Sequence, residues 1–142
     1  MMNVTSKGRY ALRIMIDLAQ HREDGFISLK TVSERTELSM KYLEMRVGNL
    51  KKAELVQSTR GKEGGYKLVK DPKDYTIGEI LRCMEDNLAP VACIKEGEIQ
   101  CDHSGGCLTV PMWKELDDIT NAYLDTVSLE DLLTGEKWRN KT

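Results

Sequence analysis

Residues 39–69, SMKYLEMRVGNLKKAELVQSTRGKEGGYKLV, contain one helical pattern followed by two strand patterns on either side of a glycine-rich turn. Leu43, Val47 and Leu50 recur at helical spacing, and Ser39 stands where an N-cap is expected. The two strand patterns predict a β-hairpin with a basic turn. A helix followed directly by a hairpin is the order of the recognition helix and wing in a winged-helix protein.

Two further helical patterns precede this stretch. The first spans residues 6–22, with Ser6 expected as its N-cap, and the second follows Ser28, its own expected N-cap. A short turn separates the second helix from the third, which is the proportion of a helix-turn-helix. Residues 1–71 are therefore predicted to form a winged helix-turn-helix that binds DNA, mostly α-helical with a small β-hairpin. The glycine-rich turn lacks the G-x-x-x-x-G-K-[ST] order of a phosphate-binding loop, so a plain hairpin turn is expected there.

The second half, residues 72–142, is expected to contain a helix, a cysteine-rich loop and a long C-terminal helix. Pro72 lies in the polar segment that marks the expected boundary, and Thr76 and Glu79 have capping-box spacing. In the long helix, four apolar residues at 4-3-4 spacing predict a dimer interface; the alternative is that they pack on the chain's own winged helix, and both could hold at once. These residues are Met112, Leu116, Ile119 and Tyr123.

Composition and charge favour a DNA-binding protein. Of the 142 residues, 40% are hydrophobic and 31% are charged, and no apolar run approaches the roughly 20 residues of a membrane span. The start, MMNVTSKGRY, lacks the apolar core of a signal peptide, so a cytoplasmic location is expected. The net charge of −2 conceals a division, because residues 1–70 contain 14 Lys and Arg against 8 Asp and Glu, while residues 71–142 contain 7 against 15. The basic first half indicates contact with a polyanion.

Three of the four cysteines lie in the cysteine loop, residues 93–107, CIKEGEIQCDHSGGC, together with His103. A disulfide is disfavoured, since cytoplasmic thiols stay reduced. The spacings C-x₇-C and C-x₅-C differ from the close pairs of zinc sites, which favours an iron–sulfur cluster and leaves zinc as the alternative. Cys83 is expected to be a core residue rather than a ligand. An enzyme is not expected, because the thiols are better explained as ligands than as part of a Cys-His catalytic pair.

Several segments in order resemble the IscR family of winged-helix transcription regulators, which includes the nitric-oxide sensor NsrR and the cysteine-metabolism repressor CymR. The segments are TSKGRYAL (5–12), SERTELSMKYLE (33–44), LVQSTRGKEGGYKL (55–68), TIGEIL (76–81), CLT (107–109) and Trp113. The resemblance covers residues 3–134. It implies a homodimer with crossing C-terminal helices that reads a palindromic operator in double-stranded DNA.

The resemblance also implies an iron–sulfur cluster, 2Fe–2S rather than 4Fe–4S, held by Cys93, Cys101 and Cys107. Such a cluster would control affinity for promoters, typically those of cluster-biogenesis genes, in a repressor or dual regulator. A nitric-oxide or redox sensor of the same fold is the alternative within the family, and a zinc-stabilised binding module is the alternative outside it.

The fourth cluster ligand departs from the family pattern. IscR-type proteins carry a histidine three residues after the last cysteine, where this chain has Val110. NsrR-type proteins use an aspartate near the N-terminus, where this chain offers Arg9 and no carboxylate. His103 is the nearest imidazole in sequence, and it is either the fourth ligand or a solvated loop residue.

Candidate DNA contacts lie in three segments. The first turns of the recognition helix offer four side chains, among which Glu44 is able to accept from a cytosine amino group. The wing is expected to insert an arginine into the minor groove, as the family resemblance implies, and the N-terminal segment is expected to touch phosphate. In these three segments the candidates are Ser39, Lys41, Tyr42 and Glu44; Arg60 and Lys62; and Thr5, Ser6 and Lys7.

Overall fold

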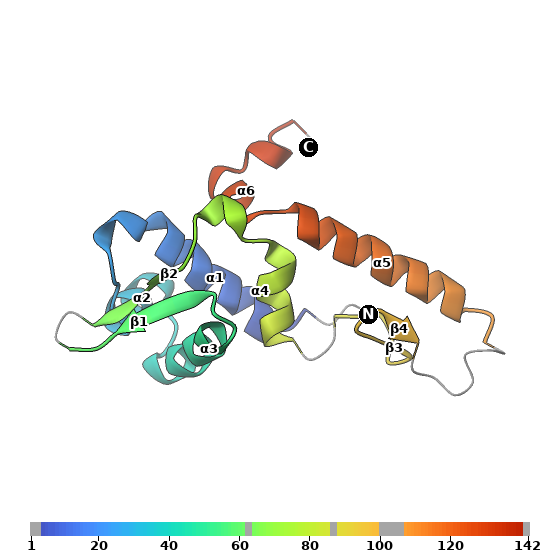
Figure 1. Ribbon diagram of the computed structural model, residues 1–142, viewed down its shortest axis with the longest axis horizontal. Coiled ribbons are helices and arrows are strands. Elements are labelled where there is room, and N and C mark those ends of the chain that lie inside the picture. The colour runs from blue at the N-terminus through green and yellow to red at the C-terminus, as the bar shows by residue number, and fades with distance from the viewer. Residues whose placement is uncertain (1–3, 62–63, 86–87, 100–106, 141–142) are drawn as a thin grey trace.

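The computed structural model describes residues 4–61, 64–85, 88–99 and 107–140 (Figure 1). In chain order the elements are α1 (Ser6–Gln20), α2 (Leu29–Thr36), α3 (Met40–Lys52), β1 (Val56–Thr59), β2 (Gly65–Leu68), α4 (Ile77–Met84), β3 (Ile94–Lys95), β4 (Glu98–Ile99), α5 (Val110–Thr126) and α6 (Leu129–Thr134). Short 3₁₀ turns lie at Arg22–Asp24, Pro72–Asp74 and Glu136–Trp138. Helices α1 to α4 and the β1–β2 hairpin form one body, from which α5 projects. The predicted fold class, mostly α-helical with a small hairpin, is confirmed.

Side-chain caps begin α2, α3 and α4 where the sequence predicted them, and Ser128 caps α6 in the same way. Ser28, Ser39 and Ser128 each accept a hydrogen bond from the backbone N–H three residues later, at 3.0–3.2 Å. Thr76 and Glu79 form the predicted capping box at the start of α4, with each side chain bonded to the backbone of the other. These bonds satisfy N–H groups that the helices leave without intrahelical partners.

The cap of α1 differs from the prediction. Thr5, not Ser6, is the N-cap, because its backbone is extended and its hydroxyl accepts from the N–H of Lys7 at 3.2 Å. Ser6 is already the first helical residue and is exposed to solvent. The helix also ends at Gln20, two residues earlier than the predicted residue 22, because His21 leaves helical geometry at φ −116° and ψ 24°.

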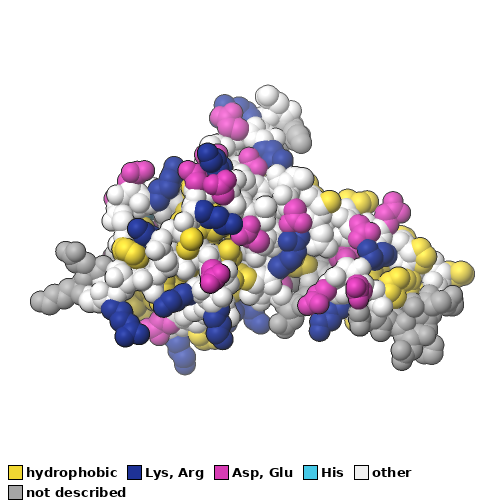
Figure 2. Space-filling model, viewed as in Figure 1, with side chains coloured by type: hydrophobic (Ala, Val, Ile, Leu, Met, Phe, Trp, Pro, Cys, Tyr) yellow, Lys and Arg dark blue, Asp and Glu magenta, His cyan; other side chains and the backbone are white. Residues whose placement is uncertain are grey.

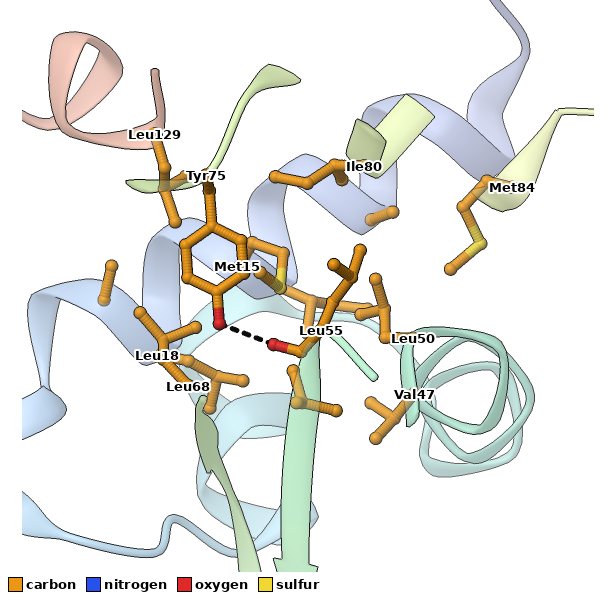
Figure 3. Packing of buried hydrophobic residues seen from close by; sticks show 14 of the residues in the cluster. Met15, Leu18, Val47, Leu50, Leu55, Leu68, Tyr75, Ile80, Met84 and Leu129 are labelled. Atoms are coloured by element: carbon orange, nitrogen blue, oxygen red, sulfur yellow. Dashed lines mark hydrogen bonds between the residues drawn. The ribbon is translucent and has the colours of Figure 1, made fainter. Parts of the chain in front are cut away.

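The core is organised around Tyr75, whose side chain is fully buried (Figure 3). Its hydroxyl donates to the Leu55 carbonyl at 2.6 Å, just before β1, and accepts from the N–H groups of Val69 and Lys70 at 2.9 and 3.2 Å, just after β2. One side chain therefore satisfies backbone groups at both ends of the wing, the β1–β2 hairpin.

The chain that follows α5 returns to the same core. Thr76 and Ser128 form an antiparallel bridge, and the N–H of Leu129 donates to the Tyr75 carbonyl at 3.1 Å. Leu129 is fully buried beside Tyr75. The hydrophobic core thus includes residues from both sides of the predicted division at residues 71 and 72, which itself stays a prediction.

Helices α1 and α2 are joined by a buried carboxylate. Asp17 is only 6% exposed and accepts two hydrogen bonds from Arg35, at 2.8 and 2.9 Å. This is the two-bond geometry in which a guanidinium and a carboxylate pair most strongly. The pair fixes α2, and with it the helix-turn-helix, against α1.

Replacing Tyr75 by phenylalanine should lower the free energy of unfolding by about 1–3 kcal/mol, because the buried Leu55 carbonyl would lose its donor. Urea unfolding followed by circular dichroism measures the change. Tyr66→Phe, the same chemical change at a half-buried tyrosine of β2, is the control and should cost less. Equal losses in the two variants would contradict the role given to the Tyr75 hydroxyl.

The wild-type protein and Tyr75→Phe also test how stability depends on pH. Burial raises the pKa of Tyr75 above its ordinary value. The stability that this group contributes is therefore complete below about pH 10, where the tyrosine of the unfolded chain titrates, and is lost as the pH rises further. The wild-type protein should lose more stability between pH 9 and 11 than Tyr75→Phe does.

Candidate nucleic-acid interface and cysteine loop

The recognition helix, α3, presents a polar N-terminal face. Lys41 and Glu44 are exposed, and the hydroxyl of Ser39 accepts from the N–H of Tyr42 as the helix cap. Two methionines on this helix are exposed as well, Met40 at 42% and Met45 at 52%. Figure 2 shows lysine and arginine side chains along the lower edge of the molecule, where Figure 1 places α3. The face of α3 therefore offers basic, acidic and apolar side chains for contact with a polyanion.

Unlike Lys41 and Glu44, Tyr42 is partly buried and packs against another helix. Its ring is half-buried and meets the ring of Tyr10 edge-on, with centroids 5.5 Å apart, while the guanidinium of Arg46 lies 5.2 Å from its centroid. Its hydroxyl is buried without a hydrogen-bond partner among the described residues. Tyr42 thus holds α3 against α1, and its expected contact with DNA stays a prediction.

The wing is a two-stranded antiparallel hairpin in which Val56 pairs with Leu68 and Thr59 pairs with Gly65. A bridge between Ile27 and Tyr66, with hydrogen bonds of 2.8 and 2.9 Å, ties its second strand to the segment before α2. This approach requires glycine at 65, because a Cβ there would lie 2.3 Å from the Ile27 carbonyl oxygen. The hairpin is therefore fixed at its base.

The turn of the wing carries the predicted minor-groove arginine. Arg60 is exposed at the end of β1. Lys62, the second predicted contact, lies outside the described residues.

The N-terminal segment is fixed by a residue that the sequence did not indicate. Glu85, just after α4, accepts hydrogen bonds from the backbone N–H and hydroxyl of Thr5, at 2.8 Å each, and from the N–H of Gly8 at 3.1 Å. A carboxylate is favoured at a helix N-terminus by the helix dipole. Ser6 and Lys7 are exposed beside it, whereas the Thr5 hydroxyl is already engaged. The pairing joins residues 80 positions apart, so local sequence carries no signal of it.

Two of the three cysteines of the cysteine loop are described. Cys93 lies just before β3, and Cys107 lies just before α5; both are thiols. Cys101 and His103 lie outside the described residues.

The pKa values of Cys107 and Cys83 are shifted in opposite directions by their surroundings. The hydroxyl of Thr109, 3.3 Å from the sulfur of Cys107, together with the N–H groups of Thr109 and Val110, lowers the pKa of Cys107 below its ordinary value. Cys83 behaves oppositely, because burial raises its pKa to about 11 and Glu79 adds to the effect. A thiolate is the form that binds metal. Cys107 therefore fits a ligand role, and Cys83 fits the core role predicted for it.

The cysteine side chains of the loop are of the chemical type that binds an iron–sulfur cluster. Cys93 and Cys107 supply soft sulfur ligands, which suit iron, and Cys101 would supply a third. Within the described residues no group of three or more His, Cys, Asp and Glu side chains is arranged to hold a metal ion. Val110, at the family's histidine position, is 2% exposed and has no ligand atom, and Arg9 is exposed on α1.

The long helix α5 has two different faces. The outer stripe, made of the four apolar residues predicted for the dimer interface, is exposed: Met112 at 53%, Leu116 at 39%, Ile119 at 59% and Tyr123 at 50%. The opposite face packs toward α4, where Arg82 donates to Asp125 at 2.8 Å and to Asn121 at 3.2 Å. The alternative that the outer stripe covers the chain's own winged helix is therefore wrong. No helix in the described parts of the chain has the length and apolar character needed to cross a membrane.

Known proteins resemble the chain over nearly its whole length. A family model described as Rrf2, iron-dependent transcriptional regulator, matches residues 4–135. The HTH-type transcriptional regulator IscR of Photorhabdus laumondii is 36% identical over 136 residues, which is 96% of this chain and 82% of the relative.

Two solved structures share both fold and sequence with the chain. CymR of B. subtilis, described as the global cysteine regulator, has a TM-score of 0.75 at 37% identity and covers 94% of this chain and 98% of its own. T. potens IscR has a TM-score of 0.73 at 34% identity, and the match covers 99% of this chain and 93% of the IscR chain. The resemblance expected from the sequence is confirmed.

The Cys107 environment predicts a difference in thiol reactivity. In metal-free, reduced protein, iodoacetamide should alkylate Cys107 at a lower pH than Cys83, as followed residue by residue with mass spectrometry. Thr109→Val removes the hydroxyl next to the sulfur, and it should move the Cys107 profile to higher pH while leaving the Cys83 profile unchanged. Identical Cys107 profiles in the two proteins would refute a role for Thr109.

Proposed function

The chain belongs to the Rrf2 family of iron-dependent transcriptional regulators, and from this membership we propose that it is a dimeric repressor or dual regulator whose promoter affinity is controlled by an iron–sulfur cluster. It is a helix-turn-helix transcriptional regulator. The cluster, the dimer and the individual DNA contacts belong to the proposal, as do a cytoplasmic location and target promoters of cluster-biogenesis genes.

The DNA-binding part of the proposal rests on exposed side chains held by a rigid frame. Lys41 and Glu44 would reach base edges or phosphates from α3, and Arg60 would enter the flanking minor groove from the wing. Ser39 would serve mainly as the helix cap, while Ser6 and Lys7 would contact phosphate. Because Glu44 is repelled by phosphate and attracted by a cytosine amino group, it would contribute to specificity more than to affinity.

Dimerisation is supported by the outer stripe of α5. Four exposed apolar side chains at coiled-coil spacing on one helix form a surface that is costly to leave in water. A two-fold pairing of α5 helices would place two recognition helices for the two halves of a palindromic operator.

Cys93, Cys101 and Cys107 would hold the cluster, 2Fe–2S rather than 4Fe–4S. The cluster would supply a redox-sensitive and labile iron centre. The observation that carries this part is that Cys93, just before β3, and Cys107, just before α5, are both thiols, with the hydroxyl of Thr109 3.3 Å from the Cys107 sulfur. His103 is proposed as the fourth ligand, because Val110 and Arg9 offer none.

The position of Cys107 suggests how the signal would travel. The residue precedes the first turn of α5, and the far end of that helix leads directly into the strand-like contact with Thr76 and Tyr75. A change in the cysteine loop would thus bias the angle of α5 and the spacing of two recognition helices. Such a bias requires the cluster to bind the two arrangements with different affinity.

A second candidate function is a regulator with a different signal. The likeness to CymR, described as a global cysteine regulator, is as high as that to the IscR proteins. A nitric-oxide or redox sensor that uses the same cluster is the third.

Metal analysis tests the cluster directly. Protein purified without air should contain iron and acid-labile sulfide in equal amounts, with visible absorption characteristic of the cluster type. Cys107→Ala should lose both, whereas Cys83→Ala should keep them, because Cys83 is a core thiol with a pKa of about 11. Zinc alone, or no metal, would remove the cluster from the proposal and leave a regulator with another signal.

The dimer is tested by placing a charge in the outer stripe. Ile119→Asp should convert the protein to a monomer in sedimentation velocity and weaken binding to a two-half-site duplex selected by the wild type. Val69→Asp makes the same change at an apolar residue that is 49% exposed outside α5, and should leave the protein dimeric. A dimeric Ile119→Asp protein would show that another surface joins the subunits.

A further inference from the structure

The exposed face of α3 has a large apolar side chain between two lysines. Met45, in the second turn of the helix, is 52% exposed. Successive residues of an α-helix are about 100° apart around its axis, so residues four or seven positions apart share one strip of its surface. Lys41 precedes Met45 by four positions and Lys52 follows it by seven, and both lysines are exposed. The three side chains therefore form one strip along the recognition helix.

This strip lies away from the core of the protein. The buried residues of α3 are Leu43, Val47 and Leu50, which lie about 140–160° around the helix axis from Met45. Single exposed apolar residues are common on protein surfaces. The position of Met45 is distinguished by the residue beside it on the strip, Gly48.

Gly48 follows Lys41 by seven positions and is a residue that the fold itself does not require. A Cβ built at Gly48 would meet no atom within 4 Å in the parts of the chain that the structure describes. Its backbone is helical, and glycine is less favourable than alanine in the interior of a helix. Glycine is used where another molecule comes close to the backbone. Gly48 therefore indicates that a partner approaches this strip closely.

The charges on the strip identify the partner as DNA rather than a second copy of the chain. Two chains that paired through this strip would bring the lysines of one against the lysines of the other, and like charges in contact are unfavourable. The phosphates that border the grooves of DNA are complementary to Lys41 and Lys52. Met45 would then face the base edges between these phosphate contacts.

The chemistry of the methionine side chain identifies what it contacts in the major groove. A thioether donates no hydrogen bond and accepts one only weakly, so it is poorly suited to phosphates and to the polar groups of base edges. The apolar group that base pairs present in the major groove is the C5-methyl of thymine. Contact between this methyl group and the flexible side chain of Met45 would remove apolar surface of both from water.

We propose that Met45 contacts the C5-methyl group of a thymine in each operator half-site, and that Gly48 lets the duplex come close enough for this contact. The inference rests on the proposed entry of α3 into the major groove and adds a residue that selects a base. Lys41 and Lys52 would supply affinity that does not depend on sequence, whereas Met45 would favour thymine over the other three bases.

Replacing thymine by deoxyuridine removes only this methyl group and leaves base pairing unchanged. A duplex is first selected in vitro by the full-length wild-type protein, and each of its thymines is then replaced in turn while affinity is measured by fluorescence anisotropy. At one position per half-site, deoxyuridine should weaken wild-type binding about threefold to fivefold, the effect of uncovering about one methyl group.

Met45→Ala should no longer respond to deoxyuridine at that position, because the contact is already lost. Met40→Ala is the matched control, since it removes the same side chain from another position of α3 that is 42% exposed. It should respond to deoxyuridine at that position as the wild type does.

Gly48→Ala separates the approach of DNA from folding. The variant should melt at or above the wild-type temperature, because alanine is the better helix former. It should nevertheless bind the selected duplex at least about fivefold more weakly, because the added methyl group would stand between α3 and the duplex. Met45→Ala should melt close to the wild-type temperature, since Met45 lies outside the core.

Three results would each overturn the inference and leave DNA binding intact: no thymine sensitive to deoxyuridine, the same sensitivity in wild type and Met45→Ala, or unchanged affinity in Gly48→Ala. Loss of the response in Met40→Ala alone would overturn it as well. A wild-type protein that selects no duplex would overturn the proposed function together with this inference. One preparation serves selection and titration, so the content of any cluster is the same in both.

Discussion

The hydroxyl of Tyr75 is the interaction on which the rest of the structure depends. It bonds to backbone groups at both ends of the wing, at Leu55, Val69 and Lys70, while the ring is buried in the core. The Tyr75 backbone in turn receives the chain that returns from α5, through the N–H of Leu129. The wing and the chain that leaves α5 therefore share one anchor.

Under the proposed function, this arrangement would carry a signal from one end of α5 to the residues proposed to contact DNA. Cys107 precedes α5, and Val127 follows it in a backbone bond to Ile77 at 2.8 Å. Along its length the helix is held to α4 by Arg82, which pairs with Asp125 and Asn121. The contacts between α4 and α5 are polar and partly exposed, and such contacts rearrange at lower cost than a packed apolar core.

The two faces of α5 differ in chemistry and in what they contact. The outer stripe is apolar and exposed, which suits a partner of the same kind (Figure 2). The inner face carries Asn121 and Asp125, which bond to Arg82 of α4. A single 17-residue helix can present two such different faces, because residues one position apart point in directions about 100° apart.

The sequence by itself determined the helices, the wing hairpin, the caps of α2, α3 and α4 and the apolar stripe of α5, because these depend on periodicity and on side chains that bond to nearby backbone. It also supplied the hypothesis that Cys93, Cys101 and Cys107 are cluster ligands, which stays a prediction. Tertiary structure alone decided which distant groups meet: Glu85 at the start of α1, the Tyr75 hydroxyl at the wing, and Arg82 of α4 at Asp125 and Asn121 of α5. These contacts depend on how helices pack against one another, and no local pattern in a chain records a partner tens of residues away.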